Sequence, residues 1–294
     1  FQKTFNKYIS KIAIDLGRPN KIPSKLAYQN LIIIPCYNEY DYIFKTLDSI
    51  NQQKLKLLNQ TLVVIVINNS NIESQNIVKN NKRTYEFLLK KKYKYEFVAI
   101  DCFSKKYSIN HKKAGVGYAR KIGLDYSLRY IKNKFSLLCS LDADTIIDKD
   151  YLYIVNKTMS TNANVCVVNF QHQKSGDPII EKAIRKYEKQ IKHIAKKIDS
   201  AGSPYGYVSM GSTIICNVFS YVACGGMSTK KATEDFYFLQ SLAKFTEVKK
   251  IKNKLVFPSS RSEQRVYLGT GYRIKEFQAL GDFKNLFFSE ESFQ

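Results

Sequence analysis

The sequence predicts an α/β fold in which a mostly parallel sheet is flanked by helices. Apolar, β-branched runs of strand length alternate with helix-like segments along the first 170 residues, and this alternation is typical of parallel sheets covered on both faces. The runs are nearly continuous, as expected of strands whose two faces are both buried. With 294 residues, of which 44% are hydrophobic, the chain is long enough for one large domain.

The predicted elements follow one another in a regular order. Strands are expected at residues 31–34, 62–67, 95–100, 135–141 and 164–170. Helices are expected at residues 39–54, 73–90, 113–131, 149–159 and 179–198. The last helix places isoleucines at helical spacing opposite a lysine-rich face, which we interpret as a solvated surface. We therefore expect a single domain over residues 1–294, with two functional halves at 30–170 and 171–294.

Composition limits the expected partners and compartment. The net charge of +22 is compatible with binding to a nucleic acid, an anionic membrane or an acidic substrate. No nucleic-acid-binding signature is present, so we expect no nucleic acid partner, while peripheral contact with an anionic membrane stays open. The six cysteines form no CxxC pair, and we expect a reduced, cytoplasmic protein, either free or at the inner face of the membrane. No apolar stretch approaches the ~20 residues of a membrane span.

Two aspartates directly follow the fourth predicted strand. Asp142 and Asp144 are two residues apart, and in an extended backbone such side chains point to the same side. Two carboxylates at the carboxyl end of a strand suit Mg²⁺ or Mn²⁺, and a metal held in this way usually bridges a diphosphate. A polar turn whose aspartates cap the next helix would show the same residues. On this segment alone both interpretations stay open.

The first two predicted strands also end in polar or aromatic residues. Pro35 ends the first strand, because proline cannot donate to the ladder, and Asn38 is suited to cap the helix that begins at Glu39. Tyr37 could stack on a nucleobase, and Glu39 could accept a hydrogen bond from a base or ribose. Asn68 ends the second strand, beside the first. Taken alone, these are ordinary strand-to-helix turns.

Glycines and cations open the helix predicted from residue 113. Backbone N–H groups at such a helix start can approach a phosphate, and either Lys113 or Arg120 could neutralise a diphosphate. Gly115 and Gly117 do not have the spacing of a dinucleotide fingerprint. A helix start with a solvated basic turn is an equally open interpretation.

Further candidates lie in the second half of the chain. Glu234 and Asp235 are adjacent, and they are either first-turn acids favoured by a helix dipole or a reactive carboxylate with its neighbour. Arg261 and Arg265 lie among glycines and small polar residues, a composition that suits a flap closing over a diphosphate and equally an ordinary surface loop. His172, just beyond a strand end, either faces a ligand or forms local hydrogen bonds.

Taken in order, these segments resemble the family 2 glycosyltransferases, which have the Rossmann-like GT-A fold and use nucleotide-diphospho-sugars. The resemblance covers roughly residues 30–240. The segments that carry it are 35–39, 68–70, 115–123, 141–144, 225–227 and 233–235. It implies that residues 30–170 form the donor half and that residues 171–294 form the acceptor half, in which the C-terminal segment is either a flap or an ordinary surface loop.

The resemblance also implies a role for each matching residue. It places Pro35, Tyr37, Glu39 and Asn68 at the base and ribose, and Asp142 at either the ribose or a metal-bound water. It implies that Asp144 binds Mn²⁺ or Mg²⁺ and that Asp235 is the catalytic base, with Glu234 capping the helix or orienting a neighbour. The family usually carries an aspartate where Asn68 or Asn69 stands, and this departure leaves the identity of the nucleotide open.

The implied activity is metal-dependent, inverting transfer of a sugar from a nucleotide-diphosphate donor to a hydroxyl of a glycan or lipid-linked acceptor. The expected context is synthesis of cell-surface glycans or glycoconjugates. One alternative is a nucleotidyltransferase that makes a nucleotide-sugar, but such enzymes carry a glycine-rich loop after the first strand, and residues 35–39 contain no glycine. The other alternative is a non-catalytic basic module that binds an anionic membrane or polymer.

Overall fold

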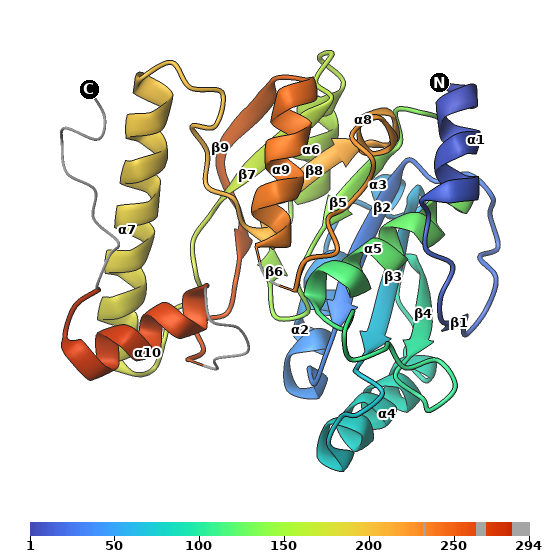
Figure 1. Ribbon diagram of the computed structural model, residues 1–294, viewed down its shortest axis with the longest axis horizontal. Coiled ribbons are helices and arrows are strands. Elements are labelled where there is room, and N and C mark those ends of the chain that lie inside the picture. Colours follow the sequence, from blue (N-terminus) through green and yellow to red (C-terminus); the bar gives the residue numbers. More distant parts are fainter. Residues whose placement is uncertain (232, 263–268, 284–294) are drawn as a thin grey trace.

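A computed structural model describes residues 1–231, 233–262 and 269–283. Its centre is a nine-stranded sheet with the order β1-β4-β3-β2-β5-β8-β7-β9-β6, and helices cover both faces of this sheet (Figure 1). The strands are β1 (Arg18–Pro19), β2 (Asn30–Cys36), β3 (Thr61–Asn68), β4 (Glu96–Cys102), β5 (Leu137–Ser140), β6 (Ile146–Ile147), β7 (Val165–Phe170), β8 (Ile214–Asn217) and β9 (Val248–Phe257). The predicted α/β class is confirmed.

The sheet has a parallel half and a mixed half. Strands β4, β3, β2 and β5 are parallel neighbours, as the sequence predicted. Beyond β5, strand β8 pairs antiparallel with both β5 and β7, and β7 then pairs in parallel with β9. The expected strand at 164–170 is therefore present as β7, but it does not lie next to β5. A short strand from much later in the chain separates the two.

The helices are α1 (Gln2–Lys11), α2 (Tyr40–Asn51), α3 (Leu55–Leu58), α4 (Gln75–Leu89), α5 (Val116–Ser127), α6 (Tyr151–Met159), α7 (Pro178–Ser200), α8 (Val218–Ala223), α9 (Glu234–Phe245) and α10 (Thr270–Leu280). The five predicted helices are present as α2, α4, α5, α6 and α7, within four residues of the predicted bounds, and no range was predicted for the other helices. Helix α7 begins at Pro178, one residue before its predicted start. Pro178 occupies the first turn, and the Asp177 carboxylate accepts hydrogen bonds from the N–H groups of Ile179 and Ile180.

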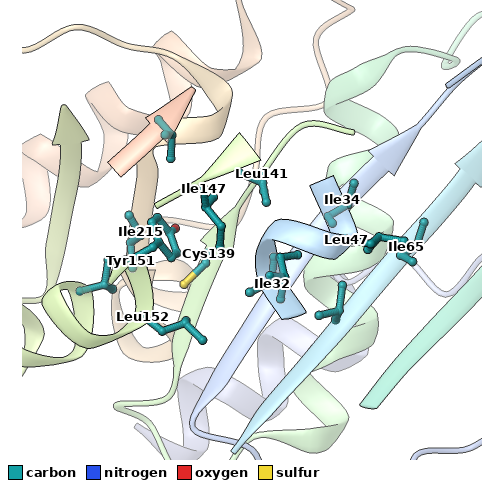
Figure 2. Close-up of a cluster of buried hydrophobic side chains, with 14 of the residues drawn as sticks. Ile32, Ile34, Leu47, Ile65, Cys139, Leu141, Ile147, Tyr151, Leu152 and Ile215 are labelled. Carbon is teal, nitrogen blue, oxygen red and sulfur yellow. The ribbon is translucent and has the colours of Figure 1, made fainter. Parts of the chain in front are cut away.

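Alternate residues of each central strand enter two separate hydrophobic cores. On one face, Ile32 and Ile34 of β2 pack with Leu47 of α2 and with Tyr151 and Leu152 of α6, as Figure 2 shows. On the other face, side chains of β2 and β3 pack with α1, α5, α8 and α9. This burial on both faces explains why the strands read as continuous apolar runs.

Helices α7 and α10 form a separate pair at one end of the molecule (Figure 1). Ala183 of α7 and Phe277 of α10 belong to a small hydrophobic cluster of their own, completed by Phe283. In the described part of the chain, no helix is long and apolar enough to cross a membrane. All six cysteines are free, and five of them are buried.

Candidate active site at the carboxyl ends of the central strands

The order of the sheet brings the predicted site segments together. Strands β3, β2 and β5 are parallel neighbours, so their carboxyl ends lie at one edge of the sheet. Asn68 ends β3, Glu39 follows β2, and Asp142 follows β5. In open α/β sheets this edge is where ligands bind.

A buried arginine joins Asp142 to the start of α9. The Nη2 of Arg120 donates to Asp142 Oδ1, and Nη1 donates to Glu234 Oε1 at 2.7 Å. The side chain of Arg120 is 2% exposed. Burial alone would lower the pKa of Arg120, but the negative charges of Asp142, Glu234 and Asp235 raise it above its ordinary value. Arg120 is thus held between two acids of the protein, and we assign it a positioning role in place of the predicted contact with a diphosphate.

Two glycines make room for this buried ion network. A Cβ at Gly211 would lie 2.5 Å from Nη2 of Arg120, and one at Gly117 would lie 2.7 Å from the carbonyl oxygen of Lys230 and 2.8 Å from Cβ of Glu234. Gly117, predicted to let a phosphate approach, instead lets the start of α9 pack against α5. Ser212, next to Gly211, donates to Asp142 Oδ2, and its hydroxyl accepts from the Asp142 N–H at 3.2 Å.

The two acids at the start of α9 have different surroundings. Glu234 is 4% exposed, and burial raises its pKa to about 7 because desolvation and the charges of Asp235 and Asp142 outweigh Arg120. Burial also raises the pKa of Asp235 above its ordinary value. Asp235 is only partly buried, and one of its carboxylate oxygens accepts the Phe236 N–H at 2.8 Å. Of the two residues, Asp235 has the larger exposed fraction.

Asp144 takes part in a second ion cluster, centred on Arg261. The guanidinium of Arg261 donates to both carboxylate oxygens of Glu39, at 2.6 and 3.0 Å. Its Nη2 also lies 2.9 Å from Oδ2 of Asp144, and its guanidinium carbon lies 4.4 Å from the centre of the Tyr42 ring. The side chains of Arg261 and Asp144 are 16% and 17% exposed.

The spacing of Asp142 and Asp144 predicted that their side chains point to the same side of an extended strand. This prediction is wrong. Strand β5 ends at Ser140, and the chain then turns, with the Thr145 N–H donating to the Asp142 carbonyl at 3.2 Å. The period-two rule applies only to extended backbone. The turn directs Asp142 toward Arg120 and Asp144 toward Arg261.

The tips of β2 and β3 are locked together by a residue that sequence reasoning missed. Asn81 of α4 accepts from the Asn38 N–H at 2.9 Å and donates to the Asn68 carbonyl at 3.1 Å and to Asn69 Oδ1 at 2.9 Å. Asn38 has a φ of 57°, and Glu39 takes the N-cap position of α2. The capping role expected of Asn38 is therefore wrong, because Asn38 supplies the left-handed turn that asparagine tolerates.

Asn68 has an acceptor that the protein leaves unused. Its side-chain Oδ1 is buried and has no hydrogen-bond partner among the described residues, although buried polar atoms are normally paired. Tyr37 is partly exposed and Pro35 is buried at the neighbouring strand tip. This edge therefore has a partly exposed aromatic ring and, beneath the surface, an acceptor without a partner among the described residues.

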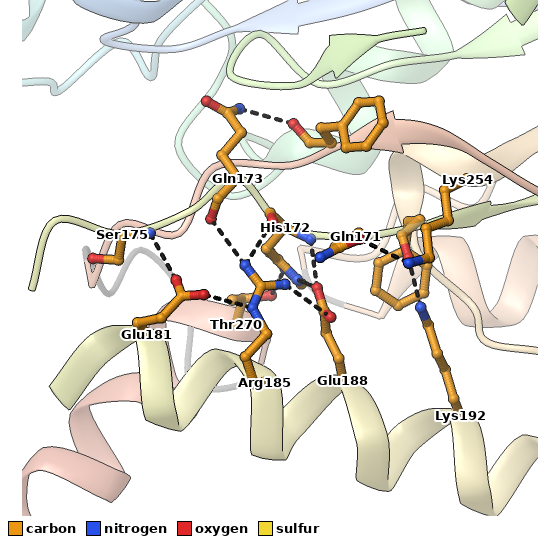
Figure 3. A network of polar contacts seen from close by, with 12 residues as sticks. Gln171, His172, Gln173, Ser175, Glu181, Arg185, Glu188, Lys192, Lys254 and Thr270 are labelled. Carbon is orange, nitrogen blue, oxygen red and sulfur yellow. Dashed lines mark hydrogen bonds and ion pairs between the residues drawn. The ribbon is translucent and has the colours of Figure 1, made fainter. Parts of the chain in front are cut away.

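A polar network connects the second half of the chain to Asp144. The side chain of Gln173 donates to the carbonyls of Asp144 and Phe257, at 3.0 and 2.8 Å. Arg185 of α7 donates to the His172 carbonyl at 2.9 Å, and Glu188 lies 2.8 Å from His172 Nδ1, as Figure 3 shows. His172 is buried, and its Nε2 lies 3.4 Å from Thr270 Oγ1. His172 therefore organises this half through local hydrogen bonds.

The remaining predicted residues are placed as follows. Lys113 is exposed in the loop before α5, and Arg265 lies outside the described residues. Within residues 1–231, 233–262 and 269–283, no group of three or more His, Cys, Asp or Glu side chains could hold a metal ion. A metal at Asp144 would therefore take its other ligands from substrate phosphates and water, as Mg²⁺ commonly does.

The sequence of residues 31–212, more than half of the chain, matches the model of a family described as Glycosyl transferase family 2. A comparison with curated protein sequences found no match.

Two of the solved structures with the same fold are from S. aureus and Pyrobaculum calidifontis. One is S. aureus TarS 1-349 in complex with UDP-GlcNAc, with a TM-score of 0.54 and 13% identity, covering 86% of this chain and 66% of that one. Another is the mannosyltransferase PcManGT from Pyrobaculum calidifontis in complex with GDP-Man and Mn²⁺, with a TM-score of 0.50 and 16% identity, covering 90% of this chain and 65% of that one. The chain thus spans about two thirds of the length of these structures. At such identities, the likeness shows the fold alone.

Proposed function

The chain belongs to glycosyl transferase family 2, and on this premise we propose that it performs metal-dependent, inverting transfer of a sugar from a nucleotide-diphosphate donor to a hydroxyl acceptor. The observation that carries the proposal is the bridge made by Arg120. One guanidinium joins Asp142, in the donor segment, to Glu234, next to Asp235. The carboxylate that would receive a proton is thereby held at a fixed position relative to the edge where the donor would bind.

In this proposal the strand tips hold the nucleotide. Tyr37 stacks on the base above Pro35, and the unused acceptor of Asn68 accepts a hydrogen bond from the base or ribose. The carboxylate of Asp142, 34% exposed, accepts from the ribose while Arg120 and Ser212 hold it in place. Glu39 lies at the same edge, and its carboxylate serves the base or ribose once it is released from Arg261.

The residues at Asp144 suit a divalent cation. The carboxylate is accessible, lies at the predicted edge and already attracts a positive group, the Arg261 guanidinium, to 2.9 Å. Asp144 would ligate Mn²⁺ or Mg²⁺, and the bound metal would stabilise the negative charge of the leaving diphosphate. Lys113, exposed in the loop before α5, is a further candidate to neutralise the diphosphate. The presence of Mn²⁺ in the PcManGT structure supports this assignment.

The transfer step requires one base. The oxygen of the acceptor hydroxyl bonds to the anomeric carbon as the bond from that carbon to the diphosphate breaks, and the electron pair leaves with the diphosphate. The hydroxyl proton passes to Asp235, whose raised pKa makes it a better proton acceptor than an ordinary aspartate. Attack opposite the leaving group inverts the anomeric centre.

The donor and acceptor are proposed by class. The neighbours bind UDP-GlcNAc and GDP-Man, which supports a nucleoside-diphosphate sugar as the donor here. We propose a glycan or lipid-linked acceptor reached from the second half of the chain, with the basic surface serving an acidic acceptor or an anionic membrane face at the cytoplasmic side.

A donor-cleavage assay tests this function. UDP-GlcNAc and GDP-mannose are each incubated with the protein, with and without Mn²⁺, and release of the nucleoside diphosphate is measured. We expect Mn²⁺-dependent release that is lost in Asp144→Ala and strongly reduced in Asp235→Asn, while Asp48→Asn, at an exposed position on α2, retains wild-type rates. Turnover like that of the wild type in both site variants would contradict the assignment.

A further inference from the structure

The cluster around Arg261 joins two residues that the proposed function uses separately. Glu39 follows β2, Asp144 follows β5, and one guanidinium contacts the carboxylates of both. Arg261 lies more than a hundred residues further along the chain, four residues after Phe257, the last residue of β9. The second half of the chain therefore places a positive charge at the donor edge of the first half.

This contact involves the same carboxylate group that the metal would use. Nη2 of Arg261 lies 2.9 Å from Oδ2 of Asp144, whereas Mg²⁺ binds carboxylate oxygen at about 2.0–2.1 Å. A guanidinium and a dication this close to one carboxylate repel each other at short range. The position that Arg261 occupies and metal binding at Asp144 therefore oppose each other.

Arg261 can exchange its ion pairs with Glu39 and Asp144 for an ion pair with a ligand. Its side chain is 16% exposed, in contrast to the 2% of Arg120. Its fork of donors matches Glu39, at 2.6 and 3.0 Å, and the same fork matches a phosphate equally well. When a diphosphate and its metal bind at Asp144, the phosphate oxygens can therefore accept hydrogen bonds from the displaced Arg261 guanidinium.

We propose, resting on the proposed function and on Asp144 as metal ligand, that Arg261 is an exchange residue. Before the donor binds, Arg261 is the counter-ion of Asp144 and Glu39. When metal and donor bind, Arg261 leaves Asp144 and pairs with the diphosphate. It holds the two carboxylates in register while the site is empty, and it opposes metal binding without a nucleotide. The metal and the nucleotide consequently bind together more tightly than either binds alone.

The proposal makes opposite predictions for two ligands in a single variant. Arg261→Met removes the charge but retains an unbranched side chain over the Tyr42 ring. We expect this variant to bind Mn²⁺ alone more tightly than the wild type, by about tenfold if Asp144 is uncovered for a tenth of the time in the wild type. We expect it to bind UDP or GDP with saturating Mn²⁺ more weakly, because the diphosphate loses a charge-assisted partner.

Both affinities are measured by titration, using the free Mn²⁺ electron paramagnetic resonance signal for the metal and calorimetry for the nucleotides. Arg129→Met is the matched control, since Arg129 is 47% exposed, pairs with Asp15 and lies near the amino end of β2, away from the site. Asp144→Asn identifies the binding that passes through Asp144. Circular dichroism verifies that each variant is folded.

Each outcome decides between the possibilities. The exchange is supported if Arg261→Met binds Mn²⁺ more tightly and the nucleotide more weakly than the wild type, while Arg129→Met shows neither change. Mn²⁺ affinity in Arg261→Met equal to or weaker than that of the wild type, with binding still dependent on Asp144, overturns the exchange and leaves the proposed function intact. Mn²⁺ binding that is unaffected by Asp144→Asn, or absent from every variant, overturns the metal assignment and the exchange together.

Discussion

Two arginines contact the short segment from Asp142 to Asp144, Arg120 at its first residue and Arg261 at its last, and their environments differ sharply. The side chain of Arg120 is 2% exposed and bridges Asp142 to Glu234, within the core between α5 and α9. The side chain of Arg261 is 16% exposed and bridges Asp144 to Glu39, at the rim of the sheet. A buried ion pair is costly to break, whereas an accessible one exchanges readily with solvent and ligands. Two aspartates separated by one residue can therefore serve as a fixed element and an exchangeable ligand.

Replacing each arginine by methionine tests whether the two ion clusters differ in their contribution to stability. This comparison has the largest expected effect. Arg120→Met leaves Asp142 and Glu234 without their shared counter-ion, and we expect a loss of about 3–5 kcal/mol in the free energy of unfolding. Arg261→Met leaves Glu39, whose side chain is 5% exposed, and Asp144, whose side chain is 17% exposed, without this counter-ion. We expect a smaller loss than for Arg120→Met, about 1–3 kcal/mol, because solvent can reach part of this cluster. Urea unfolding of both variants measures the two values. Similar losses in the two variants would remove the distinction between the clusters.

The proposed base gives the next largest effect. Asp235→Asn keeps the shape of the side chain but cannot accept a proton, and we expect kcat for sugar transfer to fall by about 10²–10⁴-fold. We expect the stability of this variant to be unchanged or increased, because a partly buried negative charge is removed near Asp142 and Glu234. Transfer assays and urea unfolding on the same sample separate catalysis from folding. A small fall in kcat, or a fall explained by unfolding, would assign the base elsewhere.

The pKa of Glu234 predicts how stability changes with pH. Burial raises this pKa to about 7 in the folded protein, above the ordinary value near 4.3 that we expect in the unfolded chain. The folded state thus binds the proton more tightly, so Glu234 contributes stability that is fully present below about pH 4.3 and is lost as the pH rises to about 7.

Thermal unfolding between pH 4.5 and 8 measures this contribution. We expect Glu234→Gln to remove part of the decrease in Tm with rising pH that the wild type shows over this range. Glu247→Gln, at a side chain that is 72% exposed, is the control and should leave the profile unchanged. Identical pH profiles for the wild type and Glu234→Gln would mean that Arg120 keeps Glu234 ionised throughout.

Ser212→Ala has a smaller expected effect than Arg120→Met. Its hydroxyl donates to Asp142 Oδ2 and lies 3.1 Å from Thr145 Oγ1. Hydrogen bonds to charged groups contribute about 1.5–3 kcal/mol, so we expect Ser212→Ala to lower the free energy of unfolding by that amount and to weaken nucleotide binding slightly. Urea unfolding and calorimetric titration with UDP and GDP measure these changes. Ser10→Ala, at an exposed serine of α1, is the control, and a loss equal to that control would show that Asp142 does not depend on Ser212.

The parallel half of the fold was predictable because its signals are local. Strands β2 and β3 are buried along their whole length, so each reads as an unbroken apolar run in the sequence. Strand β8 has four residues and pairs with β5 and β7, and its position depends on contacts with residues far along the chain. Strand β9 carries exposed lysines along its length and gives no such run. Sequence patterns report burial, and they do not report which strand lies beside which.

The site was predictable to a similar extent. The order of the polar strand ends indicated the edge at which Asn68, Glu39 and Asp142 meet, because parallel neighbours end together. The role of Arg120 could not be predicted, since an arginine in a basic segment reads as exposed and its partners are 22 and 114 residues away. The opposite directions of Asp142 and Asp144 come from a turn that the spacing alone does not indicate.

A crystal structure with Mn²⁺ and a nucleoside diphosphate, obtained by soaking with UDP and with GDP, tests the central distinction most directly. We expect Mn²⁺ on Asp144, with Arg120 still bridging Asp142 and Glu234 as it does without ligand. We also expect Arg261 to have moved from Asp144 to a phosphate oxygen. The distinction between the two arginines would be wrong if Mn²⁺ were bound by Asp142 with Arg120 displaced, or if Arg261 remained on Asp144 beside a bound diphosphate.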